Sequence, residues 1–191
     1  MLYPINEIFY SIQGEGFHIG SPAIFIRLAG CNLKCPWCDT DHSKKMEMTE
    51  DEIVTPINHY HKIPLIVVTG GEPTIHNLEY LLKELKKQMS AMIAIETNGT
   101  NPQTLGGLKE LGLIDWVTIS PKKETKFSSL KYADEIKVVF DGKINPIDYA
   151  CPESHLFIQP CSEDFRPAVD YVMKNPEWRL SIQIQKIIRV R

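Results

Sequence analysis

Three cysteines lie close together at Cys31, Cys35 and Cys38, with the spacing C-x3-C-x2-C. Thiolates at this spacing converge on one metal ion or cluster only if the loop wraps around it, and Gly30 and Pro36 favour such a loop. Thiolate ligands select zinc, copper(I) or iron–sulfur clusters. The pattern therefore predicts a metal centre. Buried structural cysteines are a weaker interpretation, because a loop that contains proline and lysine is poor core material.

Two kinds of metal centre remain open on spacing alone. The three cysteines could hold three irons of a [4Fe–4S] cluster and leave the fourth iron free for a substrate. Alternatively, His42 could complete a Cys3His zinc site, which would be closed and structural. Ordinary ferredoxin clusters use four cysteines in different local runs. Cys151 or Cys161 could supply a fourth thiolate here.

The elements that must position this loop alternate between strand and helix. Apolar, β-branched runs followed by helical patterns indicate a mainly parallel sheet. We expect strands over residues 23–28, 65–69, 92–97, 116–120, 135–140, 155–159 and 180–188, and helices from Thr49, from Asn77, over 102–111 and over 163–173. A full eight-fold barrel typically needs about 250 residues. The α/β fold expected is therefore an incomplete, TIM-like barrel of roughly six mainly parallel strands with few helices.

Polar residues follow the ends of several predicted strands, at residues 69–72, 96–98, 120–122 and 159–160. The carboxyl ends of parallel strands open on one side of the sheet, where ligands bind. Polar residues also mark ordinary turns, but four such endings in register with the cysteine loop favour one shared pocket.

Composition sets the broad class of the protein. The chain has 191 residues, 43% of them hydrophobic and 24% charged, with a formal net charge of -3. These values are typical of a globular chain, and we expect one domain over residues 1–191. The charge gives no reason to expect nucleic-acid capture. A run of about 18 apolar residues is absent, as is a secretory signal pattern, so we expect no membrane association and a cytoplasmic location.

The cysteine loop, with Trp37 before its last cysteine, and the stretch Gly70-Gly71-Glu72-Pro73 after the next strand together resemble the radical S-adenosylmethionine superfamily. The resemblance implies that Cys31, Cys35 and Cys38 hold a [4Fe–4S] cluster whose open iron chelates S-adenosylmethionine. One electron then splits the sulfonium bond, and the resulting 5′-deoxyadenosyl radical abstracts a hydrogen from the substrate. Clusters of this kind can be strongly reducing.

Further residues narrow the resemblance. Residues 12–16 (Ile-Gln-Gly-Glu-Gly), 27–40, 69–73, 96–99, 120–122 and 159–160 are similar to those of the 7-carboxy-7-deazaguanine synthases. That family of lyases converts 6-carboxy-5,6,7,8-tetrahydropterin to 7-carboxy-7-deazaguanine with loss of ammonia, in queuosine and deazapurine biosynthesis. The resemblance also implies magnesium, a flavodoxin or ferredoxin as electron donor, and a homodimer, since a truncated barrel leaves open edges that need cover.

Site residues follow from the same resemblance. Those expected at the substrate are Ile12, Gln13, Gly14, Glu15, Gly16, Arg27, Thr69, Gln185 and Arg191. Those expected at S-adenosylmethionine are Trp37, Cys38, Asp39, Gly71, Glu72, Ser120, Pro121, Lys122, Gln159, Pro160, Cys161 and Ser162, and Thr40 is the expected magnesium ligand. The chemistry is consistent: an arginine fork matches a carboxylate, and Gln13 and Glu15 can accept the N–H donors of an aminopyrimidine.

The chain departs from the family near its end, where Gln-Thr-His-Lys is replaced by Gln183-Ile184-Gln185-Lys186. Gln185 can preserve a hydrogen bond that the histidine makes, but it cannot titrate. Two other interpretations stay open: an activating enzyme that makes a glycyl radical on a protein partner, and a zinc-binding protein without catalysis. Neither of these proteins needs Thr40. Iron content separates them, because the activating enzyme would contain iron and the zinc-binding protein would not.

Overall fold

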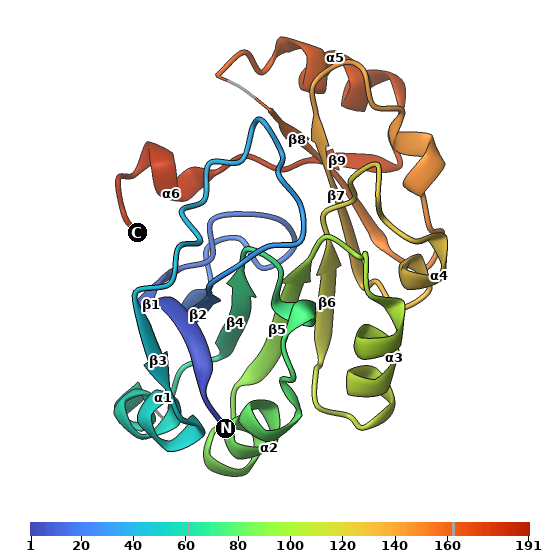
Figure 1. The fold of residues 1–191 in the computed structure, drawn as a ribbon. Coiled ribbons are helices and arrows are strands. Elements are labelled where there is room, and N and C mark those ends of the chain that lie inside the picture. The colour runs from blue at the N-terminus through green and yellow to red at the C-terminus, as the bar shows by residue number, and fades with distance from the viewer. Residues whose placement is uncertain (61, 162) are drawn as a thin grey trace.

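The computed structural model describes residues 1–60, 62–161 and 163–191. Nine strands in these residues form one sheet in the order β3-β1-β2-β4-β5-β6-β7-β8-β9 (Figure 1). The strands are β1 (Tyr3–Ile12), β2 (Pro22–Leu28), β3 (Met46–Met48), β4 (Leu65–Gly70), β5 (Met92–Thr97), β6 (Trp116–Ile119), β7 (Glu135–Phe140), β8 (His155–Pro160) and β9 (Trp178–Leu180). The helices are α1 (Glu50–Ile57), α2 (Glu79–Gln88), α3 (Pro102–Glu110), α4 (Phe127–Leu130), α5 (Arg166–Lys174) and α6 (Ile184–Ile187), with short 3-10 turns at Asn58–Tyr60, Pro73–Ile75 and Pro146–Tyr149.

The sheet is parallel from β2 to β9, whereas β1 pairs antiparallel with both β2 and β3. Because β3 and β9 are the two edges and do not pair with each other, the barrel is open. The prediction of an incomplete, mainly parallel barrel is confirmed. The sequence analysis did not identify β1 or β3. The glycines at positions 14 and 16 lie in the turn of the β1–β2 hairpin.

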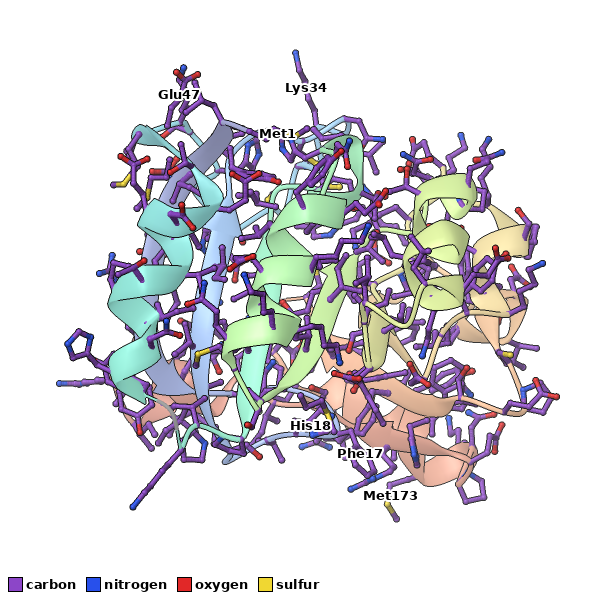
Figure 2. The ribbon with its side chains drawn as sticks, turned by 90° about the horizontal axis from the view of Figure 1, so that it is seen from below. Met1, Phe17, His18, Lys34, Glu47 and Met173 are labelled. Carbon is purple, nitrogen blue, oxygen red and sulfur yellow. The ribbon has the colours of Figure 1, made fainter. Side chains whose placement is uncertain are left out.

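Helices α1, α2 and α3 lie side by side over one face of the sheet (Figure 2). The core forms between this helical layer and the sheet: Leu81, Leu82 and Leu85 of α2 are fully buried against strand residues such as Ile66 and Ile93. Thr49 begins α1, as predicted, with a capping box in which its side chain accepts from the Glu52 N–H and the Glu52 carboxylate accepts from the Thr49 N–H. No helix among the described residues is long and apolar enough to cross a bilayer.

Strand alternation separates this core from a polar interior. Side chains on a strand point to opposite faces in turn. In β2 the helical face takes Ile24, Ile26 and Leu28, so the other face takes Phe25 and Arg27. The same alternation turns Ile136 and Val138 of β7 toward the helices. Lys137, which lies between them, points into the barrel interior. The interior is lined by apolar side chains, among them Ala23, Leu65 and Ala94, near the strand starts and by polar side chains near the strand ends.

The prediction of a strand over residues 180–188 is wrong. β9 ends at Leu180, because β8 offers partners only to residues 178–180. Beyond it the chain crosses the barrel opening, the Ile184 N–H donates to the Gly14 carbonyl at 3.1 Å, and α6 follows. The helix predicted over 163–173 begins later, at Arg166, with a proline in its first turn. The other predicted strands agree with the observed ones to within a residue at each end.

Candidate active site

A cavity of about 1310 Å³ opens at the carboxyl ends of the parallel strands. It brings together most of the residues that the sequence analysis expected at one site. Its lining includes Ile12, Gln13, Gly14, Glu15, Arg27, Cys31, Cys35, Trp37, Cys38, Asp39, Thr40, Thr69, Gly71, Ser120, Lys122, Gln159, Pro160, Cys161, Gln185 and Arg191. The expectation that the four polar strand endings share a pocket is confirmed, because each ending contributes at least one residue to the cavity lining.

The cysteine loop follows β2 and borders this cavity. Cys31, Cys35 and Cys38 all line it, and all three are free thiols. Gly71 lets the loop approach the end of β4 closely, since a Cβ there would lie 2.0 Å from the Gly30 carbonyl oxygen. Burial raises the pKa of Cys35, an effect that the nearby Lys122 ammonium opposes.

The loop's donor set fits an iron–sulfur cluster. Three thiols from one loop face a common space, and thiolates are the ligands that such clusters take. Among the described side chains, no three His, Cys, Asp or Glu residues, these cysteines included, are close enough together to hold a single metal ion. The fourth ligand of a zinc site is not in position: His42 does not line the cavity, and its backbone carbonyl accepts from the Gly30 N–H. Cys161 reaches the cavity from the end of β8, whereas Cys151 contacts Glu153 elsewhere.

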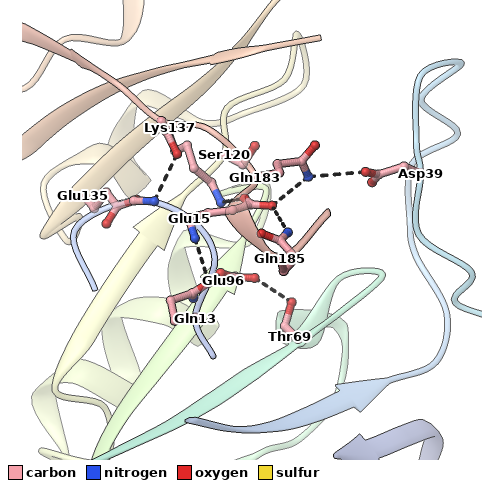
Figure 3. A network of polar contacts seen from close by, with 12 residues as sticks. Gln13, Glu15, Asp39, Thr69, Glu96, Ser120, Glu135, Lys137, Gln183 and Gln185 are labelled. Atoms are coloured by element: carbon pink, nitrogen blue, oxygen red, sulfur yellow. Dashed lines mark hydrogen bonds and ion pairs between the residues drawn. The ribbon is translucent and has the colours of Figure 1, made fainter. Parts of the chain in front are cut away.

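Glu15 is the centre of a buried hydrogen-bond network inside the barrel (Figure 3). It forms an ion pair with Lys137 of β7, and it accepts from the side-chain amides of Gln183 at 2.7 Å and Gln185 at 3.1 Å. Burial alone would raise the pKa of Glu15, but the Lys137 ammonium and these hydrogen bonds bring it below its ordinary value. Gly14 makes room for the network, since a Cβ there would overlap the Gln185 amide.

A second carboxylate, Glu96 of β5, lies beside this network. It accepts from the Gln13 amide at 3.1 Å and from the Thr69 hydroxyl at 2.9 Å. The sequence analysis noted Glu96 only as part of a polar strand ending. Three residues predicted at the substrate therefore converge on two carboxylates of the barrel interior, a setting suited to a ligand edge rich in N–H donors.

Arg27 extends from β2 into the same cavity. Its Nε donates to Glu7 of β1 at 3.0 Å, and its guanidinium lies 5.9 Å from the centre of the Phe9 ring. Arg191 also pairs with Glu7 and lies over the same ring. One carboxylate thus holds both arginines at one wall of the cavity, and its ion pair with Arg27 is made through Nε and is not bidentate.

Oxygen ligands gather at the outer end of the cysteine loop. Thr40, Asp39 and Asp41 all line the cavity there, and the Thr40 hydroxyl is 3.5 Å from the Asp39 carboxylate. Hydroxyl and carboxylate oxygens suit a magnesium ion, which keeps several of its waters. Asp39 also pairs with Lys186 and accepts from the Gln183 amide at 3.4 Å.

The strand ends opposite the loop carry further polar groups. The Lys122 ammonium donates to the Ser120 carbonyl and hydroxyl, both at 2.8 Å, and burial lowers its pKa. Gln159 is only 8% exposed, and its side-chain oxygen has no hydrogen-bond partner in the described residues. A buried acceptor left unpaired is costly, which makes Gln159 a candidate partner for a bound ligand.

The Glu72 side chain does not lie in the cavity, where the sequence analysis expected it. Its side chain is 0% exposed and does not line the cavity. Its two oxygens accept from Thr74, from the Thr97 hydroxyl and from the Asn98 N–H, so it fastens the turn after β4 to the end of β5. The Glu72 side chain therefore has no surface in the cavity, and its contact with S-adenosylmethionine stays a prediction.

Three other predicted residues are not found at the cavity. Gly16 and Pro121 are buried outside its lining, and Ser162 lies outside the described residues. Conversely, the sequence analysis did not name Glu7, Thr118 or Lys137, which do line the cavity. It named Gln183 and Lys186 only as part of the C-terminal stretch and assigned neither to a site, but both line the cavity. A signal existed for Lys137, because a lysine that alternates with isoleucine and valine in a buried strand needs a partner on the interior face.

Comparisons with known proteins agree with this geometry. The family model described as the radical SAM superfamily matches residues 25–136. The 7-carboxy-7-deazaguanine synthase of Bacteroides thetaiotaomicron is 45% identical over the full length of both chains, and that of Prochlorococcus marinus is 34% identical over 98% of this chain and 97% of the relative. The crystal structure of QueE from Escherichia coli has a TM-score of 0.76 and 30% identity, and the similarity covers 96% of this chain and 94% of that one. The thiol loop at the end of β2, the polar barrel interior and these full-length similarities together show that the chain belongs to the 7-carboxy-7-deazaguanine synthase family of radical S-adenosylmethionine enzymes.

Proposed function

We propose that this chain is a lyase that converts 6-carboxy-5,6,7,8-tetrahydropterin to 7-carboxy-7-deazaguanine with release of ammonia, in queuosine or another deazapurine pathway. The observation that supports it most directly is that one cavity is lined by three free thiols, an arginine and buried carboxylates. Those groups match, respectively, an iron–sulfur cluster, the carboxylate of the pterin and its aminopyrimidine N–H groups.

The substrate's two ends require different partners. Arg27 would take the carboxylate, because its fork is held by Glu7 through Nε alone and keeps its terminal nitrogens for a ligand. Gln13, Glu15, Glu96 and Thr69 would surround the pyrimidine end, with Gln185 beside Glu15 and Ile12 and Gly14 as wall. Arg191 would close the wall beside Arg27 through its pair with Glu7.

The cofactors would occupy the cavity next to this pocket. Cys31, Cys35 and Cys38 would hold the [4Fe–4S] cluster, and Thr40 would bind magnesium. Trp37, Cys38, Asp39, Gly71, Ser120, Lys122, Gln159, Pro160 and Cys161 would surround S-adenosylmethionine. When bound, the cluster and S-adenosylmethionine supply a 5′-deoxyadenosyl radical that removes a hydrogen atom from the substrate. The protein's own contribution is to hold the pterin in one orientation and to exclude water from the radical.

Assembly and location are part of the proposal. We expect a homodimer, because the sheet has open edges at β3 and β9. A flavodoxin or ferredoxin would deliver the electron at the cavity mouth, where Trp37 is 43% exposed. A cytoplasmic location is supported by the five free cysteines, since oxidising compartments favour disulfides. Residues 1–191 would act as one domain, because the sheet extends from Tyr3 to Leu180.

The test is anaerobic reconstitution with iron and sulfide, followed by reductant, S-adenosylmethionine, magnesium and the carboxytetrahydropterin, with the product identified by mass. Four irons per chain and a deazaguanine product are expected. Arg27→Lys keeps the charge but loses the fork, so KM should rise about 10–100-fold while iron content is unchanged. Release of 5′-deoxyadenosine without product would favour the activating-enzyme interpretation, and one zinc without iron would favour the non-catalytic one.

A further inference from the structure

Lys137 is a buried cation in the middle of β7. Its side chain is 7% exposed, and it extends into the barrel interior between the apolar residues Ile136 and Val138, which face the helices. An ammonium group in such a position is costly unless it is paired. Its ion-pair partner among the described residues is Glu15, whose side chain is 15% exposed, and the two are separated by 122 positions in the sequence.

The charged and polar groups around this pair lie on β7, on β5 and at α6. Glu135 lies on the same strand and accepts from the Phe17 N–H at 3.0 Å. Glu96 of β5 is occupied by Gln13 and Thr69. Gln183 and Gln185, beside and in α6, both donate to Glu15. Burial alone would lower the pKa of Lys137, but Glu15, Glu96 and Glu135 raise it above its ordinary value, so this lysine stays charged and cannot serve as a base.

We propose that Lys137 is a positioning residue of the pterin pocket, which keeps Glu15 ionised and oriented so that its carboxylate accepts the N–H edge of the substrate's aminopyrimidine ring. The proposal rests on the proposed function for the identity of the ligand. What the proposal adds is the coupling of Lys137 in β7 to Glu15 in the glycine turn after β1. Position 137 is not among the residues on which the resemblance to the family was based.

The electrostatics give this coupling a measurable consequence. Burial favours a protonated Glu15, and the Lys137 ammonium opposes this most strongly, helped by the hydrogen bonds from Gln183 and Gln185. Without the ammonium, the largest influence that lowers the pKa of Glu15 is lost, so burial should raise this pKa and Glu15 should hold a proton to higher pH. A protonated carboxyl presents a donor where the ligand also presents donors, so binding should weaken and should recover as the pH rises and Glu15 ionises again.

The experiment measures binding of 6-carboxypterin, the aromatic analogue of the substrate, by its fluorescence. The protein is the reconstituted enzyme with S-adenosylmethionine, at pH values from 6.5 to 9. The ratio of the Kd of Lys137→Met to that of the wild type is taken at each pH, which cancels ionisation of the ligand itself. We expect a ratio of about 10–100 at pH 7 that falls to about 3 at pH 9, as expected for a carboxyl group whose pKa has moved into this range.

Control variants separate positioning from general damage. Glu15→Gln should weaken binding by a factor that does not change with pH, and adding Lys137→Met to it should change Kd by less than about threefold, since the two residues act as one unit. Lys109→Met removes a pair of 2.7 Å with Asp134 on the outside of the barrel, and it should leave the Kd unchanged.

Lys137→Met could be too unstable to purify, because it leaves a buried carboxylate unpaired. In that case Glu15→Gln is compared with the double variant, which has neither charge. A further tenfold loss in the double variant would overturn the proposal, as would a pH-independent ratio for Lys137→Met, since either result means that Lys137 acts without Glu15. Failure of the proposed function looks different: the wild type itself neither binds the pterin nor forms product.

Discussion

Of the lysine–carboxylate pairs that line the cavity, two that share a neighbour lie at different depths. Lys137 and Glu15 lie at the floor, with side chains 7% and 15% exposed, and Lys186 and Asp39 lie at the mouth, with side chains 57% and 56% exposed. Gln183 connects them, since its amide donates to both carboxylates (Figure 3). The chemistry of the two pairs is the same, so the difference in burial decides what each contributes.

At the floor, removing one partner leaves a charge that water cannot reach, whereas at the mouth water and salt replace the lost partner. The floor is therefore a rigid template for the ligand. The mouth holds Cys38 and Trp37, both exposed, and its loop has few internal hydrogen bonds. The comparison predicts that substitutions at the mouth change catalytic activity but not the free energy of unfolding. Substitutions at the floor should change both.

The largest expected effect on activity comes from the mouth. Cys35→Ala removes one of three thiolates, so the cluster should be lost and product should fall below detection. Because Cys35 is only partly buried, the free energy of unfolding of the apoprotein should change by less than about 1 kcal/mol. Iron analysis, product assay and urea unfolding test this. Cys151→Ala is the matched control, since Cys151 is outside the cavity lining, and it should keep iron and activity. A Cys35→Ala protein that still binds four irons would contradict the assignment.

At the floor, Glu15→Ala should destabilise the protein by about 3–5 kcal/mol, because it leaves the buried Lys137 ammonium unpaired. Urea unfolding of the apoprotein measures the loss without interference from the cluster. Glu47→Ala breaks an exposed pair with Lys44 and should cost at most about 1 kcal/mol. Equal losses for the two variants would mean that the floor is hydrated and is not the rigid template inferred above.

The sequence predicted the mouth better than the floor. The cysteine loop and the strand endings are local patterns, and their convergence follows from parallel strands opening on one side. The Lys137–Glu15 pair joins residues 122 positions apart, and no local pattern states which carboxylate a buried lysine will meet. The same limit applies to Glu72: its glycine-rich motif gives its position in the sequence, but not that its oxygens accept from Thr97 and Asn98 and face away from the cavity. The alternating residues after Leu180 looked like a strand, yet a strand also needs a neighbour, which β8 does not provide there.

A smaller effect on stability is expected from ionisation of Glu135, which also lies at the floor. Burial raises its pKa to about 7 from an ordinary value of 4.5, although Lys137 and the Phe17 N–H oppose the shift. The folded state therefore holds this proton more tightly than the unfolded state. The stabilisation from Glu135 is fully present below pH 4.5 and is lost as the pH rises through 7, a loss of about 3 kcal/mol.

Glu135→Gln tests that contribution, because the amide oxygen can still accept from Phe17 but cannot titrate. Relative to the wild type, the variant should gain stability between pH 5 and pH 8 in urea unfolding experiments. Glu84→Gln, on the exposed side of α2, should follow the wild-type pH profile closely. If Glu135→Gln and the wild type differ by a constant amount across this range, the carboxyl is already ionised and the floor is wetter than the geometry indicates.

The smallest effect is expected at the mouth pair. Lys186→Ala removes an ammonium from Asp39, but both side chains are more than half exposed, so unfolding free energy should fall by at most about 1 kcal/mol and the loss should shrink further in high salt. Gln183 remains to bridge Asp39 and Glu15, so the floor should be unaffected, and the Kd for 6-carboxypterin should stay within about threefold of the wild type. The measurement is urea unfolding at low and at high salt beside the fluorescence titration. A loss of unfolding free energy comparable to that of Glu15→Ala, and insensitive to salt, would mean that α6 closes the mouth tightly enough to exclude water. The two pairs would then differ in their position along the cavity and not in their burial.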